Sequence, residues 1–261
     1  MATVLNNTVG RIHGILAVWR RNVLVWRRLM TPSLLVNFGE PLLYLLGLGY
    51  GLGMFIGEMA GMSYLAFLAS GIIASSAMNS ATFEAMYSVY TRMIPQRTYE
   101  GLMATPMSVS DILGGELLWC ATKSLISGTA ILAVAVILGA VDSPLALWVI
   151  PITFIVGLCF AGPALVMTAF ASGYDFFNYY MTLIVTPMFM LCGVFFPIDR
   201  FPELLQQIVQ ILPLTHAIAL MRPLMGGHIP GDIVLHLFVL LFYAVAGYLL
   251  AVRLVQRRLI V

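Results

Sequence analysis

Six long apolar runs dominate the pattern of hydrophobic and polar positions along the chain. A helix needs roughly 20 apolar residues to cross the hydrocarbon of a bilayer, whereas a barrel strand needs only about ten. The runs have helical length, and unpaired backbone groups are costly in lipid. The pattern therefore predicts an all-α integral membrane protein, built as one domain over residues 1–261. The six expected transmembrane helices are residues 34–56, 64–87, 111–141, 145–171, 179–196 and 232–253.

The composition fits a chain that uses the bilayer as part of its solvent. Hydrophobic residues make up 61% of the sequence and charged residues only 9%, against roughly 25% charged residues in an ordinary soluble domain. The 13 basic and 11 acidic side chains nearly balance, so no nucleic-acid partner is expected. The cysteines lie inside apolar runs, which predicts buried thiols rather than a disulfide framework or a zinc cluster.

The segment at residues 10–31 has the periodicity of an amphipathic helix. Its apolar arc, taken at about 100° per residue, holds Ile12, Ile15, Leu16, Trp19, Val23, Trp26 and Met30. Beside this arc lie Arg20, Arg21, Arg27 and Arg28. An apolar stripe with tryptophans next to a basic stripe is typical of a helix in the headgroup layer. Two interpretations stay open: a lipid anchor alone, or a helix that also contacts a cytoplasmic partner.

Arginines are concentrated in alternate loops, which predicts the orientation of the chain in the membrane. The N-terminal segment, the loop after the second run and the C-terminus are basic, whereas the loops around Glu58 and Asp142 contain no basic residue. Both termini are therefore expected on the cytoplasmic side.

Two loops contain candidate helices of their own. On the cytoplasmic side, residues 94–106 include Pro95 and Pro106, which bracket a stretch long enough for a short helix. The residue pattern allows either an ordinary connector or a helix that fits a socket on another protein. On the outer side, residues 197–230 carry an amphipathic stretch that ends at Pro213. We expect it to dip into the outer leaflet or to cap the translocation path, or alternatively to lie on the surface with no special role.

Ionisable side chains inside the apolar runs form a further group of candidates: Glu40, Glu84, Glu116 and Lys123. Charges at such positions are costly and are usually paired or exposed to water. Lys123 lies two helical turns beyond Glu116 on the same helix face. We therefore expect a charge network that ties the first three spans together near the inner surface. Structural ion pairing and contact with a substrate or gate both stay open.

The first and fifth spans carry packing and aromatic signals. Gly49, Gly53 and Gly57 form a doubled GxxxG face, which predicts close helix packing. The fifth span is rich in aromatic and methionine side chains, which suit either ordinary packing or contact with sugar rings and acyl chains.

Motifs for chemistry are missing from the sequence. It contains no GxxxxGK[ST] phosphate loop, no HExxH and no GxSxG, and its histidines are scattered. We therefore expect no catalytic residue, no metal site and no cofactor on this chain.

Several stretches, in order along the chain, resemble the ABC-2 type transporter permeases and, more closely, the nodulation protein J family. They are AVWRRNVLVWRR (17–28), EPLLYLLGLGYGLGMFIG (40–57), SYLAFLASGIIASSAMNSATFE (63–84), RMIPQRTYE (92–100), GELLWCATK (115–123) and ILPLTHAIALMRPLM (211–225). The resemblance covers the whole chain and implies a type V exporter-like transmembrane domain.

The resemblance implies a function that the residue pattern alone does not. That family supplies the membrane subunit of an exporter for lipo-chitooligosaccharide signals, with two permease copies and two ATPase subunits. It implies a bacterial inner-membrane permease that works as a homodimer, surrounded by membrane lipid, and moves an amphipathic lipid-linked or lipo-oligosaccharide substrate outward. ATP and Mg would be bound by the partner ATPase, and this chain would not be an enzyme.

Site residues follow from the same resemblance. It makes residues 94–106 a coupling helix, whose expected contacts with the ATPase are Arg97, Thr98, Tyr99, Glu100, Leu102, Met103 and Thr105. It also implies that spans one and five of two protomers line the translocation path. The residues expected along that path are Tyr44, Tyr180, Met188 and Phe189.

Two rival functions stay open at this stage. A drug or antibiotic exporter of the same architecture would differ only in its cargo. An ion-coupled secondary transporter would use the four intramembrane charges as a relay and need no ATPase, but the chain shows no repeated halves of the kind many such transporters have.

Overall fold

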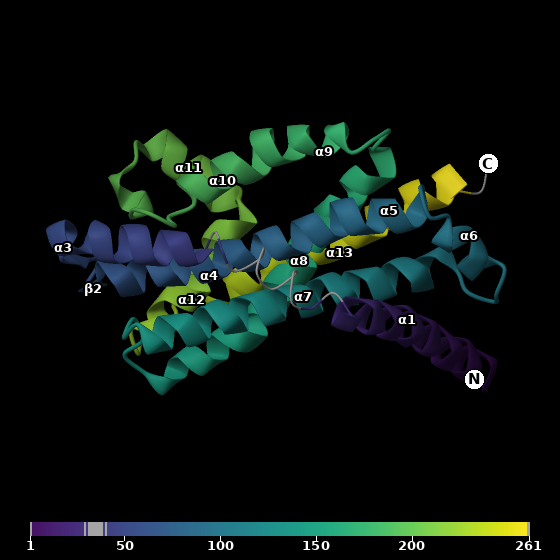
Figure 1. Cartoon of the computed structure of the whole chain (residues 1–261), viewed down its shortest axis with the longest axis horizontal. Helices are drawn as coiled ribbons and strands as arrows, with labels where there is room; N and C mark the ends of the chain where they lie inside the picture. The colour runs from purple at the N-terminus through teal and green to yellow at the C-terminus, as the bar shows by residue number, and fades with distance from the viewer. Residues whose placement is uncertain (1, 29, 31–38, 40, 260–261) are drawn as a thin grey trace.

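The computed structural model describes residues 2–28, 30, 39 and 41–259, with side chains from residue 11 onward among these. Long helices lie side by side, and α1 (Ala2–Arg28) is set at an angle to them at one end (Figure 1). The predicted all-α architecture is confirmed in its main features. The strands in the described chain are one short antiparallel pair, β1 (Glu58–Met59) and β2 (Met62–Ser63).

Four helices of the described chain are long and apolar enough to cross a membrane. They are Tyr64–Met93, made of α4 (Tyr64–Phe83), η2 (Glu84–Ser88) and α5 (Val89–Met93); α7 (Val109–Ile137); Pro144–Phe170, made of η3 (Pro144–Trp148) and α8 (Val149–Phe170); and α13 (Ile233–Leu259). These helices correspond to the second, third, fourth and sixth predicted spans. Tyr64–Met93 is the central one, because 89% of its apolar window is buried, against 17% for α13.

The first and fifth predicted spans form shorter helices. Pro41–Ile56 contains η1 (Leu45–Tyr50) and α3 (Gly53–Ile56), and the predicted start at residues 34–38 lies outside the described residues. The fifth span consists of α9 (Asp175–Tyr180), η4 (Met181–Val185) and α10 (Thr186–Leu191). The segments η1, η2 and η4 are π-helical, so a turn in each holds about one residue more than an α-helical turn.

The outer loop contains a sharply bent pair of helices. After η5 (Ile198–Arg200), the chain forms α11 (Glu203–Ile211) and α12 (Pro213–Met225), which meet at an angle of 90°. Leu204 and Ile208 of α11 are exposed, whereas most apolar side chains of α12 are buried against the long helices. The predicted amphipathic helix is therefore α11, and α12 is the part that enters the bundle.

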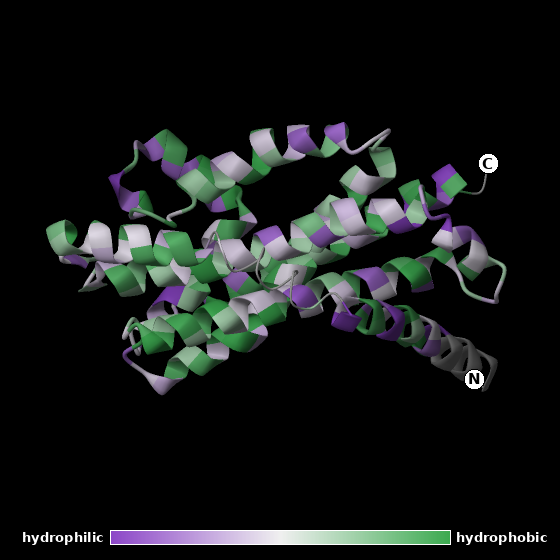
Figure 2. Cartoon of the chain, viewed as in Figure 1, coloured by the Kyte–Doolittle hydropathy of each residue, from purple (hydrophilic) through white to green (hydrophobic). Residues whose placement is uncertain are grey.

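The two ends of the molecule differ in character. Both termini and α6 (Thr98–Met103) lie at one end, and α3, the strand pair and α11 lie at the other (Figure 1). The hydropathy colouring of the ribbon in Figure 2 places hydrophobic residues along the middle of the long helices and hydrophilic ones in the last turns of α13. The predicted loop helix at residues 94–106 is shorter than expected, since α6 begins at Thr98 and ends at Met103.

Glycines allow the closest helix approaches. A Cβ added to Gly247 of α13 would lie 2.5 Å from the carbonyl carbon of Gly162 in α8, so this crossing admits no side chain. In the predicted GxxxG face, Gly49 packs equally tightly against Leu65 and Gly53 makes an ordinary contact with Tyr64. Gly57 is not part of that packed face: with φ of 69° it ends α3 instead.

Candidate functional site

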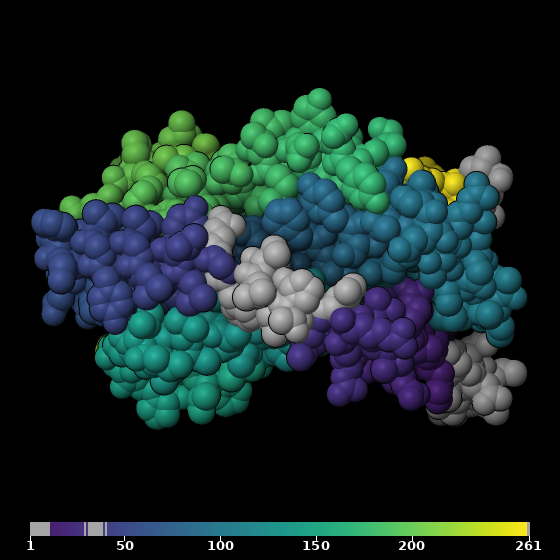
Figure 3. Space-filling model, in the orientation of Figure 1, coloured from purple at the N-terminus to yellow at the C-terminus, as the bar shows by residue number. Residues whose placement is uncertain are grey.

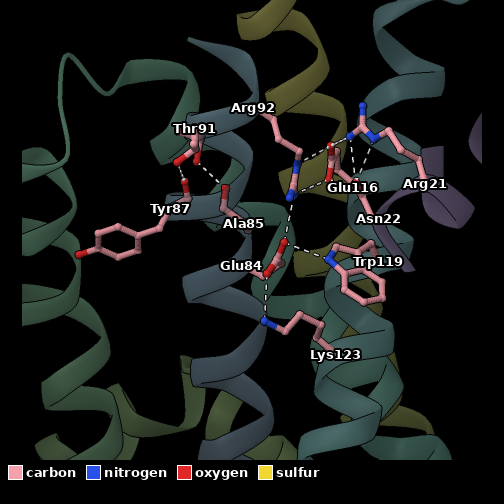
Figure 4. A network of polar contacts seen from close by, with 11 residues as sticks. Arg21, Asn22, Glu84, Ala85, Tyr87, Thr91, Arg92, Glu116, Trp119 and Lys123 are labelled. Carbon is pink, nitrogen blue, oxygen red and sulfur yellow. Dashed lines mark hydrogen bonds and ion pairs between the residues drawn. The ribbon is translucent and has the colours of Figure 1, made fainter. Parts of the chain in front are cut away.

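Two buried carboxylates lie at the centre of a polar network between α1, α7 and the helix Tyr64–Met93. Glu84 begins η2 and is 6% exposed, and Glu116 of α7 is fully buried. Figure 4 shows the network from close by, with basic side chains converging on both carboxylates. Because an isolated charge in a membrane protein is costly, each carboxylate needs its own set of donors.

Glu84 accepts hydrogen bonds from three side chains. The ammonium Nζ of Lys123 lies 3.0 Å from Oε2, and the indole Nε1 of Trp119 donates to Oε1 over 2.9 Å. Arg92, two turns further along the same helix, donates through Nη2 to Oε1 over 3.1 Å. Lys123 thus pairs with Glu84 on the neighbouring helix, although its spacing along the chain predicted that it shares a helix face with Glu116.

Glu116 is held by a larger set of donors. Arg92 donates through Nη2 to Oε2 over 2.7 Å and through Nε to Oε1 over 3.1 Å, which is a two-pronged contact. Arg21 of α1 donates through Nη2 to Oε1 over 3.1 Å, and the amide of Asn22 donates to Oε2 over 2.7 Å. Arg92 therefore bridges both carboxylates, and α1 is fastened to α7 through charge-assisted hydrogen bonds.

The observed network differs from the predicted one, because within the described residues it joins α1, and not the first span, to the second and third spans. Glu84, Glu116 and Lys123 come together as expected, while Glu40 lies outside the described residues. Sequence reasoning missed Arg21 and Arg92. Their place along an amphipathic segment and near a loop made them look like surface charges, and no regular helical spacing links Arg92 to Glu84.

The orientation of α1 corrects one part of the sequence interpretation. The side of α1 that packs on α7 contains Val18 and Asn22, which are 1% and 3% exposed. Ile12 and Leu16 of the predicted apolar arc are about half exposed instead. The sequence pattern places Arg21 in the basic stripe that faces lipid headgroups. In the structure its side chain points inward, because it donates hydrogen bonds to Glu116 and to the amide oxygen of Asn22.

The segment around α6 presents a small polar surface at the end that also holds the termini. Arg97 takes left-handed backbone angles with φ of 50° and pairs with Glu100 over 3.8 Å, and both side chains are well exposed. Thr105 is exposed as well, and its hydroxyl donates to the carbonyl of Leu102. Of the other expected contacts, Thr98, Leu102 and Met103 are half-buried.

Tyr99 is a correction to the expected contact set. Its side chain is completely buried, so it is not available to another protein in this fold. Burial, together with the nearby Glu116 carboxylate, raises the pKa of the Tyr99 hydroxyl well above its ordinary value, and the ring stays neutral. Tyr99 anchors α6 to the bundle next to the charge network.

A cavity of about 310 Å³, named the polar cavity for the hydroxyl and amide groups on one wall, lies beside α4, and the apolar side chains of Pro41, Ile72 and Phe83 also line it. Its wall is rich in hydroxyl and amide groups, contributed by Ser75, Ser76, Asn79, Ser80 and Ser127. The hydroxyls of Ser76 and Ser127 are 2.7 Å apart and hydrogen-bonded. The amide oxygen of Asn79 and the hydroxyl of Ser80 are buried without a partner in the described part of the chain. Such groups are expected to be satisfied by something that enters the cavity.

Aromatic side chains form the other wall of this cavity. Tyr44 and Phe189, two of the residues expected along the path, both line it, and their rings are 5.7 Å apart. Phe195 packs on both of these rings, at 5.9 Å and 5.0 Å. Tyr180 and Met188, the other two expected residues, are buried and lie outside the cavity lining.

Metal-binding chemistry gains no support from the part of the chain that the structure describes. Within it, no group of three histidine, cysteine or carboxylate side chains is placed to hold a metal ion.

Comparisons with known proteins agree on the type of protein. The family model described as ABC-2 type transporter matches residues 13–226. Nodulation protein J of Rhizobium leguminosarum bv. viciae is 46% identical over 244 residues, which are 94% of each chain, and nodulation protein J of Sinorhizobium fredii is 43% identical over 94% of each chain. The inner membrane transport permease YadH of Escherichia coli is 26% identical over 92% of this chain and 94% of its own length.

These matches run through α1, the charge network, α6 and the polar cavity, so they cover both candidate sites. The chain is thus a multi-pass membrane subunit of a transporter and not itself catalytic. It belongs to the ABC-2 type transporter family, and within it to the relatives of nodulation protein J.

Proposed function

We propose that this chain is the permease of an ATP-driven exporter that moves an amphipathic, sugar-bearing lipid outward across the bacterial inner membrane. The observation that carries the proposal is the polar cavity. Hydroxyl and amide groups line one wall and the rings of Tyr44 and Phe189 line the other. Aromatic faces pack on sugar rings, and hydroxyls and amides hydrogen-bond to sugar hydroxyls. The resemblance to the nodulation protein J family supports a lipo-oligosaccharide as the cargo.

The proposed topology has six spans, with both termini in the cytoplasm. Pro41–Ile56 and Asp175–Leu191 supplement the four long helices, since each has a predicted apolar run around it. The position of both termini and α6 at one end of the molecule agrees with an even number of spans (Figure 1). The arginines of α1 and of the last turn of α13 favour the cytoplasm for this end.

The proposed partner is a separate ATPase, which binds ATP and Mg and docks on α6. The exposed side chains of this surface include Arg97, Glu100 and Thr105. Tyr99 ties α6 to the core beside Glu116, so a movement of α6 would be transmitted to the charge network. We further propose two ATPase copies and a second copy of this chain, since the exposed apolar side chains of Pro41–Ile56 and α9–η4 offer a face for a partner within the membrane.

Exchanging the charges of the α6 surface tests the docking site. The double variant Arg97→Glu with Glu100→Arg keeps an opposite-charge pair at these positions but inverts the charge pattern that a partner meets. We expect an ATPase to co-purify with the unaltered protein from detergent-solubilised native membranes and to be lost with the double variant. Glu58→Arg, an exposed change at the opposite end of the molecule, is the matched control and should retain the ATPase.

Two outcomes would contradict this part of the proposal. An ATPase retained by the double variant would move the docking site away from α6. The lack of any ATPase in every preparation would favour an ion-coupled transporter instead. If inverted vesicles transport a drug and not a lipo-oligosaccharide, the chain is still a permease, but the proposed substrate is wrong.

A further inference from the structure

A second cavity, of about 470 Å³, opens beside the charge network between α1, the end of helix Tyr64–Met93 and the residues leading into α6. In the space-filling view, α1 lies next to the α5–α6 segment on this face (Figure 3). The cationic side chains Arg21, Arg92 and Lys123 line this cavity, together with one carboxylate, that of Glu84. It is a neighbour of the serine-lined cavity beside α4, since Glu84 and Lys123 line this cavity while Phe83 and Ser127, within one helical turn of them, line the serine-lined one.

The charges around this cavity do not balance. Arg21, Arg92 and Lys123 contribute three positive charges, and Glu84 and Glu116 contribute two negative ones, so one positive charge is left over in the described part of the network. A largely buried cluster with an uncompensated charge is costly unless an ion of opposite sign joins it. The excess therefore favours an anion in the cavity.

Arg21 supplies an unused donor for such an anion. Its Nη2 and Nε are engaged by Glu116 and Asn22, but its Nη1 is buried and has no partner in the described chain. Figure 4 shows this guanidinium at the edge of the network, with its free nitrogen directed away from Glu116. A guanidinium matches the geometry of phosphate oxygens, and the ammonium of Lys123 can act as a further point charge.

The remaining wall suits a group at the membrane surface. Trp26 and Trp119 contribute aromatic surface, and Gln96 and Thr98 contribute polar groups from the chain around the start of α6. Tryptophan is enriched at the headgroup level of membranes. In the last turn of α1, Arg27 and Arg28 are exposed, which fits a helix at an anionic lipid surface.

We propose that this cavity binds the phosphate group of an anionic membrane phospholipid, with Arg21 as the principal ligand and Lys123 as a supporting charge. The bound lipid would join α1 to the segment that carries α6. The inference rests on the proposed cytoplasmic orientation of this end, but not on the nature of the cargo or on ATPase docking.

Direct lipid binding tests the proposal. The purified full-length protein in detergent is mixed with phosphatidylglycerol or with a neutral diacylglycerol glycolipid of the same chain length, and retained lipid is measured by native mass spectrometry. We expect preferential retention of phosphatidylglycerol, and a fall of about tenfold in its affinity for Arg21→Gln. The matched control is Arg20→Gln, since Arg20 is the exposed neighbour on the same helix and should change the affinity less than twofold.

A second variant keeps the test decisive if Arg21→Gln does not fold. Val25 lines the cavity and takes no part in the charge network, so Val25→Trp should fill the space and exclude the lipid without removing a charge. Equal retention of both lipids, equal losses for Arg20→Gln and Arg21→Gln, or full retention by a folded Val25→Trp would each overturn the proposal. If millimolar inorganic phosphate displaces the bound lipid and the two lipids are retained equally, the cavity binds free phosphate, and the proposal of a lipid ligand is overturned. Because this binding is measured without ATP, its failure is distinguishable from loss of the ATPase.

Discussion

The charge network and the serine-lined cavity are both polar regions within an apolar bundle, but they satisfy their polar groups in opposite ways. Every carboxylate oxygen of Glu84 and Glu116 accepts a hydrogen bond from a neighbouring side chain. In the cavity, Asn79 and Ser80 present polar atoms without a partner. A satisfied network holds helices in one arrangement, whereas unsatisfied groups facing a cavity are available to a ligand. The comparison therefore assigns stability to the two carboxylates of the network and recognition to the serine-lined cavity, while Nη1 of Arg21, which has no partner in the described chain, is a network donor open to a ligand.

Glu116→Ala should give the largest effect, because it removes the acceptor shared by Arg21, Arg92 and Asn22. Breaking a buried ion pair costs about 3–5 kcal/mol, since the partner charges stay buried. We expect the midpoint of thermal unfolding of the detergent-solubilised protein, followed by tryptophan fluorescence, to fall by about 10 °C. Glu100→Ala, which removes an exposed carboxylate, is the control. Equal unfolding midpoints for Glu116→Ala and Glu100→Ala would show that the network does not stabilise the fold.

Lys123→Met should destabilise the protein less than the loss of Glu116. Glu84 keeps its hydrogen bonds from Arg92 and Trp119 in this variant, so only one of its donors is lost. We expect a fall of about 5 °C in the same midpoint, corresponding to about 1–3 kcal/mol for one charged hydrogen bond. A fall as large as that of Glu116→Ala would show that Lys123, rather than Arg92, is the main partner of Glu84.

Removing the free polar groups of the cavity should change transport with the smallest effect on stability. In Asn79→Leu with Ser80→Ala, no hydrogen bond within the described chain is lost, so the unfolding midpoint should stay within about 2 °C. We expect ATP-dependent export of a lipo-oligosaccharide into inverted vesicles to fall about tenfold, as for the loss of one or two hydrogen bonds to a ligand.

Thr82→Val is the matched control for this cavity variant. The Thr82 hydroxyl is also buried without a partner on α4, but it does not line the cavity. It should change neither transport nor the unfolding midpoint appreciably. If the cavity variant transports normally, or if Thr82→Val is equally impaired, the serine-lined cavity is not a recognition site.

The helices could be predicted from sequence because length and apolarity decide whether a segment crosses the bilayer. Four predicted spans recur as long helices, and Glu84, Glu116 and Lys123 were expected to meet. Which face of a helix is buried could not be predicted, since lipid-facing and protein-facing residues are similarly apolar in a membrane. This limit explains why Arg21 was assigned to the lipid surface.

Tyr99 shows a second limit, because its burial depends on tertiary contacts. A tyrosine in a short polar loop has the composition of a surface contact, and only the position of α6 over the bundle places it in the core. The polar cavity was predicted only in part: Tyr44 and Phe189 were expected along the path, but the wall of serine and asparagine side chains was not. Serines in a transmembrane helix are common, and only the geometry shows that those of α4 face a cavity opposite Tyr44.

The π-helical segment η2 explains why Arg92 reaches Glu84. In a regular α-helix, residues eight apart differ by about 80° around the axis, so these two side chains would diverge. The wider turn of η2 lies between them and takes up about one additional residue, which returns Arg92 to the side of Glu84. In effect, η2 is a single-residue insertion stored within the helix. Deleting one residue there would restore a regular α-helix with seven residues from Glu84 to Arg92, a difference of about 20° around the axis, and so would keep Arg92 on the side of Glu84.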